Sequence, residues 1–506
     1  MNEQMMNLFG NQFSGMQIDA LKKALEILPG TAGVNAPAGT IDTWKPEMMS
    51  AIQTTLYAQQ ADLKFSRALF TDPTNSTFYQ YRRETELGKT DIFGAHSSQS
   101  GMPQFANPAW DRGNVTVCLH HELADSSMLA QSQNFYGAPG QDLLGYITER
   151  KMLAMLIREN RIFMRGNQNL DPLMPSGILQ LHKKWDGVTE LTPKEYAAKE
   201  QVIDLRNRRL NFDDINKADR VLVANFDSRN LRALWMPQVA IEGLTSQALN
   251  NTLIYRQEGL GNGAIINNTV AGVKSTGLNT IMFNYDIFID RHPARHVMDA
   301  NETISTTAPA VPNVSSGTNA SIADTDSKFI TSDAGTYYYG VCAVGSGGIS
   351  KMALINATPA TIAAAGNSIN LKFVDGAGAN VTTGYIIYRG LKNGLATDLL
   401  YPIIEISTTQ LANGYDEGGA TVVRDKNRII PGTHDAIMVS VESDGYTLAK
   451  DVVRRVEFQN HIMNGFVRFQ VPMAVSAPSV QAKLLHGYAL AHPAPPKMIV
   501  FRNIQA

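Results

Sequence analysis

The chain has 506 residues, of which 44% are hydrophobic and 18% charged, and its formal net charge is -2 at pH 7. This length predicts two or three domains, and the composition is typical of folded globular proteins. A near-neutral charge argues against a dedicated nucleic-acid-binding protein, which usually carries a basic stripe. The two cysteines, Cys118 and Cys342, lie far apart. They exclude a disulfide framework and a cysteine zinc site, and they fit assembly in a reducing cytoplasm.

The chain begins MNEQMMNLFGNQF, with neither a basic segment nor a long apolar one. We therefore expect no signal peptide. No apolar run approaches the roughly 20 residues that a transmembrane helix requires.

Residues 1–70 predict an arm of two short helices. Ile18, Leu21, Leu25 and Leu28 share one face of the first helix, and a turn-rich linker, GTAGVNAPAGTID, precedes the second. Two such helices suggest an arm that packs on something outside itself. An ordinary helical hairpin remains the alternative.

Residues 71–125 predict a long two-stranded hairpin, with TFYQYRRETEL and VTVCLHHEL as its arms. The loop between the arms contains three aromatic residues, Phe93, Phe105 and Trp110, and the lysine Lys89. A two-stranded ribbon cannot bury all these aromatic rings by itself. We therefore expect them to pack against another subunit, with a surface loop that carries incidental aromatics as the alternative.

A long helix is predicted for QDLLGYITERKMLAMLIRENRIF. Its expected apolar stripe consists of Leu143, Tyr146, Ile147, Leu153, Ala154 and Ile157. Arg150 falls inside that stripe, where it would need to extend to solvent or meet an acidic partner. Gly166, in the sequence Arg-Gly-Asn, is expected to end the helix in a left-handed conformation.

The segment from about 187 to 300 has a mixed pattern. LTPKEYAAKEQVIDLRNRRLNFD predicts one helix, with Thr192 as its N-cap. Residues 221–224 predict a buried strand, and residues 231–234 predict a helix that follows it after a turn. A further strand is expected in IMFNYDIFID.

Residues 303–428 predict an inserted all-β sandwich. Charged residues become fewer there, and short alternating segments such as TYYYGVCAV, INLKFV, GYIIYRG and YPIIEI are separated by turns. After the insert, DAIMVSVES and KLLHGYAL predict a return to the main body. Such insertions succeed where the two ends of the host loop already lie close together.

The sequence offers little catalytic chemistry. His120 and His121 are adjacent on an expected strand and point to opposite faces, so they cannot easily share a metal ion. The polar segment from Asp290 to His296 lacks a nucleophile or a paired carboxylate nearby, and we expect a solvated or inter-subunit loop. We predict no catalytic, cofactor-binding or metal-binding residues, no cofactor and no enzymatic activity.

The order of these parts resembles the major capsid proteins of tailed bacteriophages, whose fold is called HK97-like. The resemblance depends on the arm, the long hairpin, the long helix with its Arg-Gly-Asn end, Pro175-Ser-Gly-Ile-Leu179, and the segment from Asp219 to Leu234. It covers most of residues 1–300 and 429–506. The insert resembles a fibronectin type III or immunoglobulin-like domain. Two of its segments, 337–350 and 383–389, occur in the reverse of the usual order, so either the domain is circularly permuted or one match is false.

The resemblance implies an α+β capsid fold with an inserted all-β sandwich. Its parts would be an arm (1–70), an extended loop (71–125), a peripheral domain with a spine helix (126–218), an axial domain (219–302), the insert (303–428) and a return to the body (429–506). Contacts between subunits would involve Phe93, Phe105, Trp110, Arg112 and Arg150. Lys89 would be the candidate for an isopeptide cross-link between subunits.

The resemblance also implies a function. The chain would assemble with itself as hexamers and pentamers into an icosahedral shell that encloses double-stranded DNA, with the insert on the outer surface. Portal, scaffolding and decoration proteins would be its partners, with no membrane, and we expect no cleaved prosegment. Assembly would occur in the bacterial host cytoplasm. The alternatives are an encapsulin-like compartment protein, or a carbohydrate-active enzyme or adhesin with a fibronectin-type accessory domain.

Overall fold

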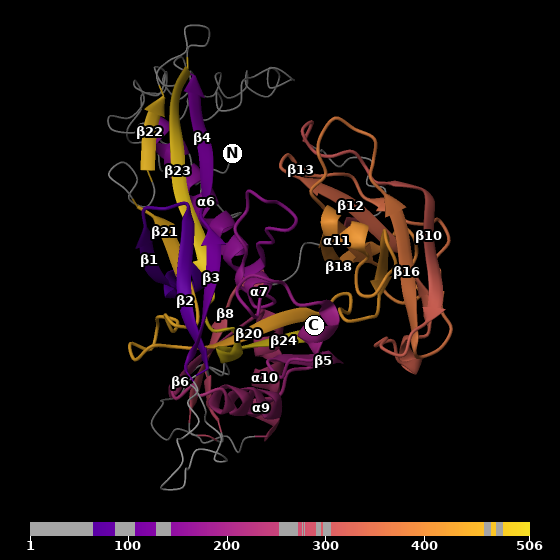
Figure 1. Ribbon diagram of the computed structural model, residues 1–506, viewed down its shortest axis with the longest axis horizontal. Helices are drawn as coiled ribbons and strands as arrows, with labels where there is room; N and C mark the ends of the chain where they lie inside the picture. The colour runs from indigo at the N-terminus through magenta and orange to yellow at the C-terminus, as the bar shows by residue number, and fades with distance from the viewer. Residues whose placement is uncertain are drawn as a thin grey trace, which may run out of the picture. The chain divides into compact units, whose positions relative to one another are not determined.

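The computed structural model describes residues 64–86, 107–127, 143–251, 272–275, 277, 279–289, 295–296, 305–459, 467–471 and 479–505 (Figure 1). These residues form an α+β protein, which confirms the predicted fold class. The chain divides into two compact units, the first made of Met1–Tyr57, His121–Ala154 and Arg468–Leu485, and the second of the remainder. The predicted arm lies largely outside the described residues, apart from the short helix α4 (Lys64–Ala68).

A small apolar cluster organises the described part of the first unit. Ala124, Leu144 and Ala482 are buried together, and Ile147 packs against them. The cluster lets the start of a helix contact two strands. These elements are α6 (Leu143–Arg165), β4 (Cys118–Ser127) and β23 (Ser479–Ala491).

One sheet of the body has the order β1-β21-β23-β22, with β4 also paired to β23. Its further strands are β1 (Phe70–Thr74), β21 (Arg454–Phe458) and β22 (Val467–Val471). In the second unit, α6 packs on this sheet through the ring of Phe163, which meets the ring of Tyr488 edge-on at 5.4 Å. The predicted long helix is therefore confirmed, and it ends at Arg165.

The buried face of α6 differs from the predicted stripe. Met155, Glu159, Asn160 and Phe163 are buried, whereas Ala154 and Arg150 are exposed and Leu153 and Ile157 are only half-buried. The predicted stripe was wrong at Ala154, because polar residues occupy the inner face there. Asn160 accepts a hydrogen bond from the backbone N–H of Ser66 at 2.9 Å and donates one to Asp286 at 3.1 Å. Apolar periodicity cannot detect a face held by satisfied polar groups.

Gly166 ends the helix by close packing and does not adopt the predicted left-handed conformation. A Cβ atom at Gly166 would lie 2.3 Å from the carbonyl oxygen of Pro175, and one at Gly177 would lie 2.5 Å from that of Ile162. The N–H of Gly177 donates to the carbonyl of Gly166 at 2.8 Å. Both glycines are required because two backbone segments approach more closely than a side chain allows.

A second sheet has the order β5-β24-β20-β6-β8-β7. Its strands are β5 (Val202–Arg208), β24 (Met498–Ile504), β20 (His434–Ser440), β6 (Leu231–Met236), β8 (Thr280–Tyr285) and β7 (Gly272–Lys274). Helices α9 (Phe212–Ala224) and α10 (Gln238–Asn251) share one apolar core with this sheet (Figure 1). The strands predicted near residues 281 and 435 are confirmed.

Two predictions in this region were wrong. Residues 221–224 form the end of helix α9, and residues 231–234 belong to the buried strand β6, which is the opposite assignment. Helix α9 begins earlier, at a capping box in which Asn211 and Asp214 each bond the other's backbone N–H. Short apolar runs do not distinguish a buried strand from a buried helical segment.

The second wrong prediction concerns the segment after Thr192. Thr192 caps a helix as predicted, in a capping box with Glu195, but helix α8 (Pro193–Ala197) has only five residues. The chain then enters β5, which pairs in parallel with the C-terminal strand β24. A tertiary strand partner overrides the helical propensity of this segment.

A buried polar network joins the elements of the second sheet. The guanidinium of Arg232 on β6 is fully buried and lies 3.3 Å from Asp219 of α9 and 3.4 Å from Asp227. It also donates to Ser440 of β20 at 2.6 Å, and Asn279 donates to Asp219 at 2.9 Å. One arginine thus fixes a helix against two strands and the loop before β8.

Replacing Arg232 with methionine should lower the free energy of unfolding by about 3 to 5 kcal/mol, because the buried carboxylate of Asp219 loses its countercharge and that of Asp227 keeps only Arg229, at 3.5 Å. Urea denaturation of the purified subunit measures this change. The control is Lys217→Met, which removes an exposed charge from α9 and should change stability by less than about 0.5 kcal/mol. A loss below about 1 kcal/mol in Arg232→Met would contradict the importance assigned to the network.

The insert is an all-β unit of two main sheets around one core. One sheet has the order β10-β16-β19, and the other has the order β13-β12-β17-β18-β9 with β14 on β12. Buried residues of both sheets, including Tyr339, Ile369, Phe373 and Ile387, form a single apolar cluster. The strands are β9 (Arg295–His296), β10 (Asn313–Ala323), β12 (Tyr339–Gly345), β13 (Gly348–Ile349), β14 (Ala353–Leu354), β16 (Asn367–Val374), β17 (Gly384–Arg389), β18 (Leu399–Ser407) and β19 (Val422–Asp425).

Short elements complete the chain between these strands. They are α7 (Ile178–Leu181), η3 (Ile287–Ile289), η4 (Thr331–Asp333), the paired strands β11 (Gly335–Tyr337) and β15 (Ala360–Ile362), α11 (Thr408–Asn413) and η5 (Pro495–Lys497). Strand β9 pairs with β18, so the all-β unit includes residues before 303.

The two segments that resemble an immunoglobulin-like domain are neighbours in the second of these sheets. Strands β12 and β17 pair antiparallel from Tyr339↔Arg389 to Val344↔Gly384. Strands C and F of an immunoglobulin-type sandwich are likewise adjacent. This pairing fits a permuted order, and the named topology remains a prediction.

Candidate functional site

The first candidate surface is the outer face of the β2–β3 hairpin. Strand β2 (Phe78–Glu86) pairs antiparallel with β3 (Ala109–Thr116), from Phe78↔Thr116 to Glu84↔Trp110. The hairpin is confirmed, but VTVCLHHEL contributes only its first two residues to the second arm. Most of that segment belongs to β4, which pairs with β23 instead.

The inner face of the hairpin is fixed to the body. Tyr81 is buried, and a Cβ atom at the opposite Gly113 would lie 2.2 Å from its ring, so only glycine fits there. Arg83 pairs with Asp111 at 2.7 Å and donates to the carbonyl of Trp185 at 2.7 Å. These contacts hold the ribbon in one orientation on the second unit.

The outward face of the same hairpin carries aromatic and cationic side chains. Trp110 is 65% exposed and Phe78 is 46% exposed. Arg82 and Arg112 are exposed and lie directly opposite each other in the strand register. Neither guanidinium forms an ion pair within the described part of the chain, and like charges in this position destabilise a strand pair. The face therefore suits a partner that supplies apolar area and negative charge.

The other predicted contact residues are only partly placed. Lys89, Phe93 and Phe105 lie outside the described residues, so the predicted cross-link and anchor roles stay predictions. Arg150 is exposed on α6, in the first unit. The structure therefore brings together Trp110 and Arg112 on one hairpin face and tests none of the predicted contacts.

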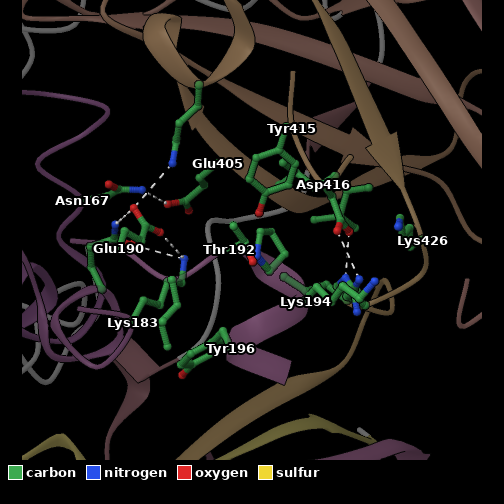
Figure 2. A pocket seen from close by; sticks show the side chains of 18 of the residues that line it. Asn167, Lys183, Glu190, Thr192, Lys194, Tyr196, Glu405, Tyr415, Asp416 and Lys426 are labelled. Carbon is green, nitrogen blue, oxygen red and sulfur yellow. Dashed lines mark hydrogen bonds and ion pairs between the residues drawn. The ribbon is translucent and has the colours of Figure 1, made fainter. Parts of the chain in front are cut away.

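A second candidate site is the seam between the all-β unit and the body, which encloses a cavity of about 390 Å³. Figure 2 shows side chains from the segment around α8 facing side chains from the segment around β18 and β19. Asn167 donates to Glu405 at 3.1 Å, and Lys194 pairs with Glu417 at 3.2 Å. On the rim, Asp416 pairs with Arg428 at 2.7 Å. The lining pairs acids with cations, as expected of an inter-domain seam.

Hydrogen bonds also connect the all-β unit to the body where the chain returns to β20 and β24. Asn503 of β24 accepts the N–H of Ile430 at 2.9 Å and donates to the carbonyl of Arg428 at 3.0 Å. Thr383 donates to the carbonyl of Leu170, and Arg206 donates to that of Lys328. These bonds make the unit a fixed part of the second unit.

Charged groups are also buried under α6. His486 of β23 lies 3.0 Å from Glu159 and 2.7 Å from Glu457, and Arg455 lies 3.1 Å from Glu159. Burial alone would lower the pKa of His486, but the hydrogen bonds to the two carboxylates outweigh it and raise that pKa above its ordinary value. A protonated His486 therefore stabilises the helix on the sheet. Its contribution is present below the unfolded pKa and is lost as the pH rises through the folded pKa.

Two stacked histidines have lowered pKa values, in contrast to the raised pKa of His486. The rings of His182 and His492 lie 5.7 Å apart, and both are buried. His182 Nε2 donates to the carbonyl of Met498 at 3.2 Å, and Nδ1 accepts from Tyr196 at 2.9 Å. Burial, and next the neighbouring His492, lowers the pKa of His182 to about 3. Burial lowers the pKa of His492 to about 4.

Sequence analysis missed these groups because a histidine shows its burial only after folding. It also missed Arg232, although a charged residue inside the apolar run LRALWM was a usable signal. The adjacent pair His120 and His121 does not form a site with both rings. His120 faces Arg158 at 2.9 Å, and His121 is exposed.

Two further findings concern metal binding and membrane spanning. Among the described residues, no three His, Cys, Asp or Glu side chains are grouped so that they could hold a metal ion. Within the same ranges, the helices reach neither the length nor the apolarity that crossing a bilayer requires.

The fold resembles known shells over most of its length. No family model and no curated protein matches the sequence. The capsid of a native GTA particle covers 95% of this chain and 98% of its own, at 8% identity and a TM-score of 0.39. The mature capsid of bacteriophage PhiM1 covers 89% of both chains, at 10% identity and a TM-score of 0.39. The SrpI encapsulin of Synechococcus elongatus covers 93% of this chain and 97% of its own, at 8% identity and a TM-score of 0.38.

The stacked histidines predict an acid-dependent loss of stability. Below about pH 6.5 the unfolded chain binds protons that the folded chain excludes, so each ring contributes a slope of up to about 1.4 kcal/mol per pH unit down to its folded pKa. His492→Asn keeps a donor for the carbonyl of Val452, which lies 2.6 Å from Nδ1. Between roughly pH 6 and 4, it should reduce the slope of the free energy of unfolding against pH by up to about 1.4 kcal/mol per pH unit, the contribution of one ring.

Urea midpoints across that pH range measure the effect. The control is His121→Asn, which removes an exposed histidine and leaves the buried stack in place. Equal slopes in wild type and His492→Asn would refute the assignment.

Proposed function

We propose that this chain is the major capsid protein of a tailed bacteriophage. It assembles with itself as hexamers and pentamers into an icosahedral shell around double-stranded DNA, and the all-β unit is displayed on the outer surface. It is not an enzyme. Its partners are other capsid subunits and portal, scaffolding and possible decoration proteins. It assembles in the host cytoplasm and resides in the virion.

The observation that carries the proposal is the outward face of the β2–β3 hairpin. Its inner face is fixed to the body by Tyr81, Gly113 and Arg83, whereas Trp110 and the opposed pair Arg82 and Arg112 face outward. A ribbon with a fixed inner face and such an outer face fits a surface that lies on a neighbouring subunit. The neighbour would supply apolar area for Trp110 and carboxylates for the two arginines.

The order of elements supports the same proposal. A hairpin, a 23-residue helix and a sheet covered by helices follow one another as the sequence resemblance implies, and the all-β unit interrupts this order between β8 and β20. A shell repeats one subunit many times, so its geometry must be reproducible while its contacts adapt. Close glycine packing after α6 and buried ion pairs supply such reproducibility.

The first test is assembly of the full chain, expressed with and without its neighbouring phage genes, by negative-stain electron microscopy and mass photometry. We expect closed particles, or free hexamers and pentamers. Particles that contain double-stranded DNA would favour a phage head, and particles that enclose protein cargo would favour an encapsulin-like compartment. A monomer that never assembles under either condition would overturn the proposal.

Arg112→Glu tests the hairpin face directly. Within the subunit it replaces a repulsive cross-strand pair with an attractive one, so the free subunit should gain roughly 0.2 to 1 kcal/mol of stability. Assembly should nevertheless weaken, because the neighbour's carboxylates now meet a like charge. Light scattering measures the assembly concentration, and the control is Lys372→Glu, the same charge change at an exposed position of β16 in the all-β unit. Unchanged assembly of Arg112→Glu would remove the hairpin from the interface.

Replacing residues 295–428 with a short Gly-Ser linker should leave assembly intact, because both ends of the insertion lie at one place. Arg165 donates to the carbonyl of Ile289 at 2.8 Å and pairs with Asp435 at 2.9 Å, on the two sides of the insertion. Electron microscopy of the deletion variant checks the result. Loss of shells from a folded deletion variant would show that the all-β unit clamps subunits together.

A further inference from the structure

An exposed aromatic residue follows helix α9 in an unusual backbone conformation. Phe226 has φ of +60° and is 86% exposed, the largest exposed fraction among the large apolar side chains of the described residues. Val223, one turn earlier, is 51% exposed. The N–H of Phe226 donates to the carbonyl of Val223 at 3.1 Å, and that of Asp227 donates to the carbonyl of Leu222 at 3.2 Å. These bonds close the helix and hold Phe226 in the left-handed region.

This conformation is uncommon and costly for a bulky side chain. A glycine or asparagine would end the helix with less strain. The phenyl ring gains little burial within the described part of the chain to offset that strain. We call Phe226 and Val223 the knob.

The same sheet and its helices carry a hollow with a mixed lining. A cavity of about 280 Å³ lies beside the first half of α10, and Leu210, Val239, Gly243 and Ile504 line it together with polar side chains such as Arg209 and Glu242. A Cβ atom added to Gly243 would meet no atom within 4 Å, so the missing side chain leaves open space. A cavity of about 150 Å³ already accommodates benzene, and the hollow can therefore take a phenyl ring.

The knob and the hollow lie at opposite ends of one helix. Leu210 precedes the first residue of α9 and Phe226 follows the last, and a helix of 13 residues is about 20 Å long. The knob therefore cannot fill the hollow of its own chain. Two different surfaces that fit each other on separate copies make a head-to-tail contact, which closes into a ring when the rotation permits.

Charged side chains flank both surfaces. Lys217 and Arg220 are exposed on α9 near the knob, and neither forms an ion pair within the described ranges. Glu242 and Arg209 are both exposed at the hollow. Docking the knob of one copy on the Glu242 side of the next copy's hollow would bring opposite charges together, whereas the Arg209 side would repel them.

We propose that the knob of one copy inserts into the hollow of the next copy around a symmetry axis of the shell. The inference rests on the proposed capsid function and names one of its subunit contacts. The occupant of the hollow is a second copy of this chain.

Two substitutions test the contact while sparing the fold. Phe226→Gly relieves the strained backbone and removes the knob. Gly243→Leu fills the hollow and replaces a glycine inside a helix with a strong helix former. Both free subunits should unfold at the wild-type urea midpoint or higher. Both should need at least a tenfold higher concentration to assemble.

The controls are matched in chemistry and lie on the all-β unit. Leu395→Gly removes a side chain that is 66% exposed, and Gly419→Leu adds one where a Cβ atom meets nothing within 4 Å. Both should assemble like wild type. Wild-type assembly of Phe226→Gly and Gly243→Leu would overturn the contact and leave the capsid function standing. A wild-type chain that never assembles would overturn both.

Cysteine cross-linking decides the arrangement, even where one variant folds poorly. A chain with both Phe226→Cys and Val239→Cys, oxidised after assembly, should form a covalent ladder that ends at the ring size. The native Cys118 and Cys342 are buried and should not contribute to it. A product that stops at the dimer would contradict the head-to-tail arrangement, and the absence of any product would refute the contact.

Discussion

The guanidinium of Arg165 holds the junction between the body and the inserted all-β unit, on which the rest of the structure depends. It is the last residue of α6, and it contacts the carbonyl of Ile289 and the carboxylate of Asp435. The chain leaves the body for the all-β unit just after Ile289 and returns just before Asp435. One planar donor thus holds the helix and both ends of the insertion together, with bidentate geometry that lysine could not supply. The adjacent Gly166 lets the next backbone segment approach closely enough to complete the junction.

Buried charges recur wherever elements distant in sequence must meet. Arg232 joins α9, β6 and β20, His486 joins α6 to its sheet, and Arg389 of the all-β unit bonds Asp425 and Asn427 near the exit strand. Apolar packing of similar volume would often be at least as stable as a buried ion pair. A paired charge, however, accepts few geometries, so these networks are suited to defining register and orientation. In the proposed shell, such definition would matter more than added stability, because one subunit would have to fit identical neighbours.

The sequence predicted the parts that depend on local patterns. The 23-residue helix, the Thr192 cap, the hairpin and the all-β insert follow from periodicity and turn residues. The sequence-based prediction failed where a partner distant in the sequence determines the secondary structure. Val202–Arg208 became a strand because β24 lies beside it, and residues 221–234 reversed their order of helix and strand. On the hairpin, residue type singled out Trp110 and Arg112, which lie exposed on one face, and their role as contacts stays a prediction. The sequence did not single out Phe226, because local sequence determines neither its exposure nor its positive φ.

Unfavourable features on the surface of a free subunit share one physical explanation. The opposed Arg82 and Arg112 repel each other, the backbone at Phe226 is strained, and Gly243 leaves a hollow beside α10. Each lowers the stability of the isolated chain, and none is relieved within the described residues. A neighbour that supplies carboxylates, apolar cover and a filling ring would convert each into a gain on association, since binding only to the folded state stabilises that state. Assembly then favours subunits that are already correctly folded, because the complementary surfaces exist only when the buried networks are complete.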